Sequence, residues 1–424
     1  MRAMKDSGIE WIGQIPQTWE TKKLKFLVDL RTEKTVDKTV PAPYVGLEHV
    51  ASSVGTLIED YEAIIDFTGD TLDYKTGDVL FGKLRPYLAK AIQAETDGRC
   101  SSEFWVMDPH SINGRFLLYS VLSHGFISCI DQSTFGVKMP RAEWEYAGNQ
   151  ELALPDSDTQ CRIADFLDAK CADIDALIVA KEKSNALLKE RRQSIIYEAV
   201  TKGLNPDAPM KDSGIEWIGQ IPDNWGVIPL SKVSERMNNG YVGPTRNIFF
   251  DSGVRYLQSL HIKEGKIIFE KAPYYVSPEW AAEHALGTVH TGDVLIVQTG
   301  DIGQVACVPE EYNECNCHAL IIVTPRSRFC CGEFLSYLLQ SHYGRNQLLS
   351  CRTGALHPHL NSGNIGSIKL PIPPVDEQKS IVAQLNLECE EYDKAIQQNN
   401  AIIEKLKEYR QSIIYEAVTG KIEI

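Results

Sequence analysis

The polar residues best suited to chemistry lie in segments where the two halves of the sequence differ from each other. In the first half they are Lys83, Arg85, Tyr87, Ser133, Thr134 and Lys138. In the second half they are Gln298, Thr299, Arg352, Thr353, His357, His359 and Asn361. Arginine and lysine suit guanine and phosphate groups, while glutamine and asparagine suit adenine. These residue types favour contacts with DNA, although a plain surface-loop role stays open for each residue taken singly.

The segment from Gly77 to Leu84 has the GxxxxGK spacing of a phosphate-binding loop. Such a loop must curl its backbone amides around phosphate and supply a Ser or Thr for magnesium. Here the interior DVLF has the pattern of a strand, and Leu84 has no hydroxyl group. The matching segment TGDVLIVQ, which begins at Thr291, has no lysine. We therefore expect no nucleotide site in this segment.

The only metal-like grouping is Cys315, Cys317 and His318. It lacks the second pair of ligands that a zinc site requires, and the chain continues as the apolar strand pattern ALIIVTP. His357 and His359 favour structural roles or phosphate contacts over metal binding. The sequence therefore predicts no metal site.

No catalytic constellation is present in the sequence either. Glu264 and Lys266 have the acidic-x-Lys spacing of a metal-dependent nuclease, but the nearest Pro-Asp pair, at residues 222–223, lies about forty residues upstream. A turn between two strands explains this spacing better. The chain also lacks a methyltransferase motif, a GxSxG elbow and a Cys/His/Asp grouping. We predict that it has no catalytic residues.

Two segments recur almost letter for letter, which identifies a tandem duplication. Residues 4–16, MKDSGIEWIGQIP, return without change at residues 210–222. Residues 189–201, KERRQSIIYEAVT, return at residues 407–419 with Tyr409 in place of Arg191. The offsets are 206 and 218 residues, so each repeat contains roughly two hundred residues.

The closing part of each repeat, about 46 residues long, predicts one long helix. It has no internal Pro or Gly; Pro155 and Pro373 precede the two copies, and Gly203 and Gly420 follow them. At about 1.5 Å per residue each helix would reach roughly 69 Å. In the second copy the 3,4 spacing of a coiled coil is carried by Leu385, Cys389, Tyr392, Ile396, Ile403, Leu406, Ile413 and Ala417.

Neither helix could bury this apolar stripe alone, so we expect each to pair with its duplicate. Arg192 and Arg410, and likewise Lys181 and Asn399, are matched polar residues in the stripe, and such residues fix helix register. The short linker at residues 203–209 leads directly into the second repeat. We therefore expect antiparallel helices, an approximate twofold and quasi-circular arrangement, and Met1 near Ile424.

Residues 31–148 and 237–367 diverge between the repeats, yet both keep TGDVL followed by short apolar strands. Short strands separated by turn residues indicate mixed domains, so the fold class is α+β. Trp11, Trp19, Trp217 and Trp225 are expected to be core anchors of the two domains.

The chain has 424 residues, 43% of them hydrophobic and 24% charged, with a net charge of -14. No apolar run approaches the roughly 18 residues of a membrane span, and no signal region is visible, so we expect a cytoplasmic protein. Eleven irregularly spaced cysteines favour reduced thiols. The acidic balance predicts weak DNA binding by the chain alone and a basic partner.

The whole chain resembles the specificity subunit of type I restriction-modification systems. The resemblance rests on IGQIP at Ile12 and Ile218, on TGDVLFGKLRPYLAKA and CSSEF, on the span from TGDVL to TGALHPHLN, and on the two RQSIIYEAVT helix ends. It implies two target recognition domains, each reading half of a split DNA sequence, and two helices that act as spacers. The implied boundaries are residues 1–154 and 206–372 for the domains, and 155–205 and 373–424 for the helical spacers.

The resemblance also implies partners: double-stranded DNA, two copies of the modification subunit and a motor endonuclease subunit. S-adenosylmethionine, ATP and magnesium would belong to those partners, with no cofactor in this chain. We assign the partner surface to Arg191, Tyr197, Tyr409 and Tyr415 on the helices. The alternative is a non-enzymatic coiled-coil interaction protein whose two β-rich domains bind protein or glycan.

Overall fold

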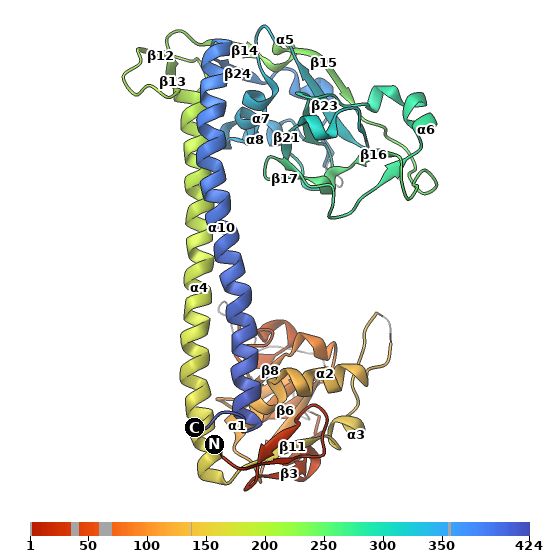
Figure 1. The fold of residues 1–424 in the computed structure, drawn as a ribbon, viewed down its shortest axis with the longest axis vertical. Helices are drawn as coiled ribbons and strands as arrows, with labels where there is room; N and C mark the ends of the chain where they lie inside the picture. The colour runs from red at the N-terminus through yellow and green to blue at the C-terminus, as the bar shows by residue number, and fades with distance from the viewer. Residues whose placement is uncertain (1, 35–41, 59–69, 137, 355–357) are drawn as a thin grey trace. The chain divides into compact units, whose positions relative to one another are not determined.

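The computed structural model describes residues 2–34, 42–58, 70–136, 138–354 and 358–424 (Figure 1). The chain divides into two compact units. Unit 1 consists of Met1–Glu182 and Asn399–Ile424, and unit 2 of Lys183–Gln398. The two longest helices, α4 (Ser157–Lys202) and α10 (Val375–Val418), each contribute residues to both units. In the described part of the chain, no helix carries an apolar stretch long enough to cross a membrane.

The predicted pair of long helices is confirmed, and local signals account for their ends. Asp156 precedes α4 and accepts hydrogen bonds from the backbone N–H and the hydroxyl of Thr159, which lower the pKa of its carboxyl. Gly203 and Gly420 follow the helices with φ of 75° and 68°, the left-handed conformation that favours glycine at a helix end.

Within each unit the apolar faces of α4 and α10 pack together. In unit 1, residues 163–174 of α4 share a core with residues 413–418 of α10. In unit 2, residues 195–200 of α4 share a core with residues 381–389 of α10. In unit 1, Asp175 contacts Arg410 and Lys181 contacts Asn399, so higher residue numbers on α4 meet lower ones on α10. In unit 2, Arg192 contacts Asp393, and the later residues 195–200 pack with residues 381–389. The helices are therefore antiparallel within each unit. The approximate twofold and quasi-circular arrangement stay predictions.

The polar residues expected in the helix stripe are in place. Arg192 and Arg410 are buried, with 8% and 4% exposure. Lys181 donates a 3.1 Å hydrogen bond to the side-chain oxygen of Asn399, the residue 218 positions later. A residue and its own duplicate are therefore in direct contact.

Unit 1 surrounds an antiparallel four-stranded sheet of order β4-β10-β7-β8, beside a three-stranded sheet of order β5-β9-β6. Smaller pairs are β1-β2 and β11-β3. Its strands are β1 (Met4–Asp6), β2 (Gln14–Pro16), β3 (Glu20–Lys23), β4 (Val28–Arg31), β5 (Tyr44–Val45), β6 (Thr71–Tyr74), β7 (Val79–Gly82), β8 (Ala91–Gln93), β9 (Gly98–Ser101), β10 (Phe104–Pro109) and β11 (Glu151–Leu154). Its helices before α4 are η1 (Leu24–Phe26), η2 (Leu47–His49), η3 (Pro86–Leu88), α1 (Gly114–Leu122), α2 (His124–Gln132) and α3 (Trp144–Ala147).

Unit 2 repeats this plan with the four-stranded order β15-β23-β20-β21 and the three-stranded order β19-β16-β22. Its pairs are β12-β13, β14-β24 and β17-β18. Its strands are β12 (Met210–Asp212), β13 (Gln220–Pro222), β14 (Gly226–Pro229), β15 (Ser234–Asn239), β16 (Val254–Leu257), β17 (Ile262–Lys263), β18 (Lys266–Ile267), β19 (Tyr275–Val276), β20 (Val294–Val297), β21 (Val305–Cys307), β22 (Asn316–Cys317), β23 (Leu320–Pro325) and β24 (Lys369–Ile372). Its helices before α10 are α5 (Leu230–Val233), η4 (Ser259–His261), α6 (Pro278–Glu283), η5 (Ala285–Gly287), η6 (Glu310–Tyr312), α7 (Gly332–Gln340), α8 (His342–Ser350) and α9 (Ser362–Ile365).

The four-stranded sheet of each unit is buried on both faces, which explains its uninterrupted apolar strands. In β7, Val79 and Phe81 pack in the core that contains α1 and α2, while Leu80 packs in the core of the smaller sheet. In β20, Val294 and Leu295 divide in the same way between two cores. Because both faces of the sheet are covered, the side chains that can differ between the two units without disturbing a core lie in the loops beyond the strand ends.

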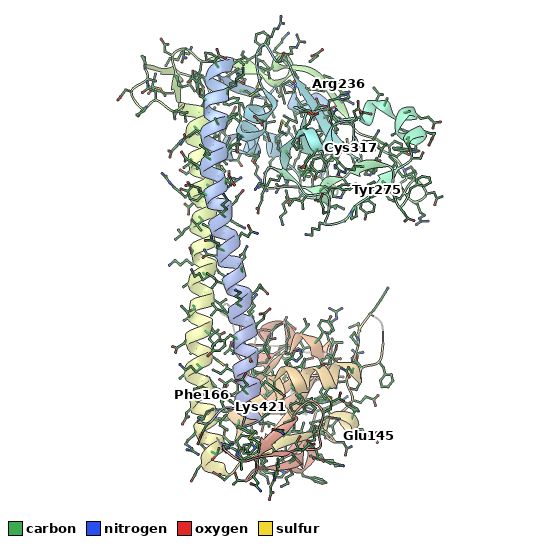
Figure 2. All side chains as sticks on the ribbon, in the orientation of Figure 1. Glu145, Phe166, Arg236, Tyr275, Cys317 and Lys421 are labelled. Atoms are coloured by element: carbon green, nitrogen blue, oxygen red, sulfur yellow. The ribbon has the colours of Figure 1, made fainter. Side chains whose placement is uncertain are left out.

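The repeated TGDVL segment supplies a buried aspartate in each unit that pairs with a partly exposed arginine. Arg31 on β4 binds Asp78 at 2.7 Å, and this hydrogen bond raises the pKa of Arg31. Arg236 on β15, labelled in Figure 2, binds Asp293 at 3.2 Å. The strand β7 occupies the interior of the GxxxxGK spacing, as the sequence predicts. The motif is therefore a structural one.

Glutamine 160 and its duplicate Gln378 connect each long helix to the rest of its unit. The amide of Gln160 donates to Pro155 O and accepts from the Asn113 backbone N–H at 2.8 Å. Gln378 makes the same two contacts, with Pro373 O and the Cys331 N–H. Identical contacts explain why these glutamines are shared while neighbouring residues differ.

The predicted role of the tryptophans is right for three of the four. Trp19 and Trp225 are buried, and Trp11 packs edge-on against Phe126 at 6.3 Å between ring centroids. Trp217 is 74% exposed, so the prediction of a core anchor is wrong there. At the position of Phe126, unit 2 has Gly344, which offers no ring for Trp217 to contact.

Candidate functional site

In unit 1 the structure brings the two candidate segments of the first repeat together. The first, loop A, is residues 83–89 after β7, and the second, loop B, is residues 133–142 after α2. The Ala142 N–H donates to Lys83 O at 3.0 Å, and the Arg85 N–H donates to Pro140 O at 2.8 Å. Residues separated by more than fifty positions thus form one surface at the end of the sheet.

Two side chains of loop A, those of Arg85 and Tyr87, are exposed. Arg85 is exposed, and its Nη2 donates to Lys138 O on loop B at 3.3 Å. Its backbone has φ of 52°, a left-handed conformation that leads into Pro86. Tyr87 is 52% exposed and lies against a different hollow, beside Ser53 and Val54. Arg85 and Lys138 are therefore closer to a common site than Tyr87 is.

Ser133 and Thr134 have local roles at the end of α2. The Ser133 hydroxyl donates to Ile130 O at 2.7 Å, and the Thr134 hydroxyl donates to Asp131 O at 2.8 Å. Each hydroxyl has one hydrogen, so these groups are left only as acceptors toward a ligand. Their predicted base contacts stay predictions, now restricted to donor groups such as the exocyclic amines of adenine and cytosine.

Unit 2 has the same pair of loops, loop A′ (residues 298–304) after β20 and loop B′ (residues 351–361) after α8. The Leu360 N–H donates to Gln298 O at 3.0 Å, which matches the bond from Ala142 to Lys83 in unit 1. Loop B′ is closed by two 2.9 Å backbone hydrogen bonds between Thr353 and His359. The same bridge joins Phe135 and Arg141 in loop B, 218 residues earlier.

The remaining candidates of unit 2 fall on these loops or at their ends. Arg352 donates to Leu349 O at 2.8 Å, and Asn361 accepts from the Gly363 N–H at 2.8 Å as a helix cap. Thr299 is exposed, whereas the side-chain oxygen of Gln298 is buried and has no hydrogen-bond partner within the described part of the chain. His357 lies outside the described residues.

Two residues of the junction in unit 1 are missing from the sequence-based candidates. Phe135 is 74% exposed on loop B, and Arg141 holds Glu103 with two contacts of 2.9 and 3.0 Å. The signal that identifies them is the spacing TxGxxxPR, which aligns with RTGALHPH at the offset of 218. Their counterparts, Thr353 and His359, were found in the second repeat.

The four candidates for partner contact divide into two kinds. Arg191 and Tyr409 are exposed on the helices, with 53% exposure for Tyr409. Tyr197 donates to Trp217 O at 3.1 Å, and Tyr415 donates to Ile12 O at 3.2 Å. Lys421, labelled in Figure 2, also donates to Ile12 O and lies 3.8 Å above the Tyr415 ring. These two tyrosines fasten the repeated entry segment of each unit to a helix end.

The Cys315, Cys317 and His318 grouping belongs to the core of unit 2. Cys315 and Cys317 are buried, with 4% and 0% exposure. Burial raises the pKa of Cys315 to about 11 and also raises that of Cys317, so both thiols stay protonated rather than forming the thiolates that bind zinc. Among the described residues no cluster of three metal-ligating side chains occurs.

Comparison with known proteins places this geometry in context. Residues 224–408 match the family described as Type I restriction modification DNA specificity domain. The chain is 23% identical over 433 residues to the type I restriction enzyme MjaVIII specificity subunit of Methanocaldococcus jannaschii, covering 97% of this chain and 94% of that protein. It is 23% identical over 345 residues to the EcoBI specificity subunit of Escherichia coli, covering 77% and 72%.

The fold has a counterpart among solved structures. A chain from structural work on complex assembly and conformational transition of the type I R-M system superposes with a TM-score of 0.73. The two chains are 20% identical, and the match covers 96% of this chain and 99% of the other. This likeness concerns the fold.

Proposed function

We propose that this chain is a type I restriction-modification specificity subunit, which gives its complex its DNA sequence specificity without performing catalysis itself. Each unit reads one half of a bipartite target. The observation that carries this proposal is the repeated junction: loops A and B in unit 1, and A′ and B′ in unit 2, are joined by matching backbone hydrogen bonds but have different side chains. A shared framework with different polar side chains is what reading two different half-sites requires.

The DNA contacts that we propose come from these loops. Contacts to phosphates set the position of a protein on DNA, whereas contacts to base edges specify the sequence. Lys83, Arg85 and Lys138 suit phosphates or guanine, and Gln298 suits adenine. The full set of proposed contacts is Lys83, Arg85, Tyr87, Ser133, Thr134, Lys138, Gln298, Thr299, Arg352, Thr353, His357, His359 and Asn361.

The partners follow from the same proposal. Arg191 and Tyr409 lie on exposed helix positions and serve as contacts for two modification subunits, one for each repeat, while Tyr197 and Tyr415 hold the entry segments beside them. S-adenosylmethionine is supplied by the modification subunits, and ATP and magnesium act in the motor endonuclease subunit. The net charge of -14 supports DNA binding as part of a complex whose partners carry the basic surface. Because its substrate is cellular DNA, we place the protein in the cytoplasm.

Methylome sequencing tests the proposal. The chain is produced together with its modification subunit in a host without other adenine methylation, and all methylated sites are mapped. We expect one bipartite motif, with Lys83→Ala and Arg85→Ala altering one half of it and Gln298→Ala the other half. Methylation without any sequence motif would overturn the proposal. A gel-shift competition in which random fragments compete as well as the target would favour the coiled-coil interaction protein instead.

A further inference from the structure

Loop B of unit 1 presents a large aromatic ring to solvent beside the proposed DNA contacts. Phe135 is 74% exposed, and its backbone pairs with Arg141 through hydrogen bonds of 3.3 and 3.2 Å. Gly136, with φ of 100°, turns the chain directly after it. The backbone that carries the ring is thus fixed by hydrogen bonds on both sides of the loop. The equivalent position in unit 2 is Thr353.

A hollow of about 560 Å³ lies next to this ring. Its walls include Phe104, Trp105 and Trp144, and the two tryptophan rings meet edge to face at 5.5 Å between centroids. Trp105 in turn stacks on Phe81 at 5.5 Å, so the wall is part of the folded core. Ligand sites commonly have volumes of roughly 300–1,000 Å³ and walls of this aromatic kind.

The charges around the hollow favour a nucleic acid. Lys83 and Arg141 line it, and Arg85 and Lys138 are joined beside it on the two loops. Two carboxylates are also near. Both carboxylate oxygens of Glu103 accept hydrogen bonds from Arg141, and Glu143 is exposed. Aromatic rings within a cationic surface are the combination by which proteins hold single bases, through stacking on the ring and attraction of the phosphates.

We infer that Phe135 and the hollow beside it form a subsite for one unstacked DNA base in the half-site read by unit 1. The inference rests on the proposed function and adds a mode of reading to it. A ring inserted at a base step partly unstacks it, and the cost depends on which bases are separated. Unit 1 then selects part of its half-site by how easily the DNA can be unstacked there. Unit 2 has Thr353 at this position and reads its half-site without an inserted ring.

The test uses the chain in complex with its modification subunit and duplexes that carry 2-aminopurine at successive positions of the first half-site. This base becomes fluorescent when it leaves the stack. The methylated adenine itself is left out of the comparison, because methyltransferases extrude their target base. At one other position, we expect the fluorescence of 2-aminopurine to increase on binding of the wild-type complex. The increase should be absent with Phe135→Ala and present with Phe135→Trp. Phe26→Ala removes a phenylalanine of unit 1 that is 55% exposed outside both loops, and serves as the matched control.

Loss of one stacking contact should weaken specific binding by Phe135→Ala roughly 5- to 150-fold, with an unchanged dependence on salt because no phosphate contact is removed. An unchanged affinity and an intact fluorescence signal in Phe135→Ala would overturn the inference. So would loss of the modification subunit from the complex on size-exclusion chromatography, since Phe135 would then be a protein contact. If instead the wild-type complex does not prefer its target over a scrambled duplex, the proposed function itself fails.

Discussion

Arg410 on α10 lies 3.0 Å from Asp175 on α4, measured from the guanidinium Nε to a carboxylate oxygen. The duplicated pair, Arg192 and Asp393, has a separation of 3.1 Å in unit 2. The environments of the two pairs differ. Arg410 also donates to Ser53 O and Val54 O at 2.6 and 2.8 Å, so it connects both helices to a loop of unit 1. Arg192 shares Asp393 with Lys266, which contacts the other carboxylate oxygen at 2.6 Å.

Replacing Arg410 by Leu should therefore destabilise unit 1. The change leaves Asp175 and two backbone carbonyls without their donor, and we expect a loss of about 2–4 kcal/mol after allowing for the partial exposure of Asp175. Arg192→Leu should cost less, because Asp393 keeps Lys266. Urea unfolding measures both, with exposed Arg191→Leu as control. Equal stability of Arg410→Leu and the control would contradict this expectation.

Unit 2 should lose stability on mild acidification. Burial lowers the pKa of His261, whose Nδ1 accepts from the Gln258 N–H and whose Nε2 lies 2.8 Å from Ala272 O, and burial also lowers the pKa of His318. A lowered folded-state pKa means that the unfolded chain takes up protons first. The stability that the two neutral histidines contribute is therefore fully present above about pH 6.5, the ordinary pKa of histidine, and declines as the pH falls below that value.

Thermal unfolding at pH 7.5 and pH 5.5 measures this effect. The difference in Tm between the two pH values should be smaller in His261→Gln than in the wild type, because one of the two histidines no longer takes up a proton. A difference of the same size in both proteins would show that His261 does not contribute.

Exchanging residues 31–148 for the same span of a relative should change only one half of the DNA target. Next to the second boundary, the Lys25 N–H donates to Gly148 O at 2.9 Å, a contact with the retained chain that does not depend on the exchanged side chains. Methylome sequencing reads both halves at once. A change in both halves, or in neither, would refute independent reading by the two units.

Lengthening both helices should lengthen the unread gap between the half-sites. Seven residues inserted after Ala180, with seven more after Gln398, keep the helix faces in phase and add up to about 10 Å. At about 3.4 Å per base pair, this is at most roughly three extra positions. A pair of four-residue insertions, which changes the phase, is the control and should reduce methylation. Recovery of the original spacing in the seven-residue variant would exclude the helices as the determinant of the gap.

The parts of the fold that could be predicted are those where the duplication compares two copies of one structure. The offset of 218 identified α4 and α10, matched Lys181 with Asn399 as duplicated polar residues of the helix stripe, and assigned loops B and B′ to equivalent positions. The helices and the loop bridges rest on backbone hydrogen bonds, which two diverged sequences share. The polar loop candidates could be assigned to a surface for the same reason.

The remaining features depend on single side-chain neighbours that the repeats do not share. Trp11 and Trp217 stand in identical segments, yet Trp11 lies against Gly125 and Phe126, while unit 2 has Tyr343 and Gly344 in their places. A residue with a side chain at position 125 would clash with the Trp11 ring. Phe135 was likewise missed because a lone phenylalanine in a sequence suggests a core residue, and only the folded chain shows its exposure.

The hydrogen bond between Lys181 and Asn399 also has a consequence for how such a chain can evolve. In an ancestor made of two identical half-length polypeptides, this position would face its own copy, and a mutation there would alter both sides at once. With lysine at this position, two ammonium groups would face each other and repel. Because the two polypeptides have one sequence, neither could change without the other. A chain that carries both halves is free of that restriction, and here the ammonium of Lys181 bonds to the side-chain amide of Asn399. The same freedom allows the two units to carry different polar side chains on equivalent loops.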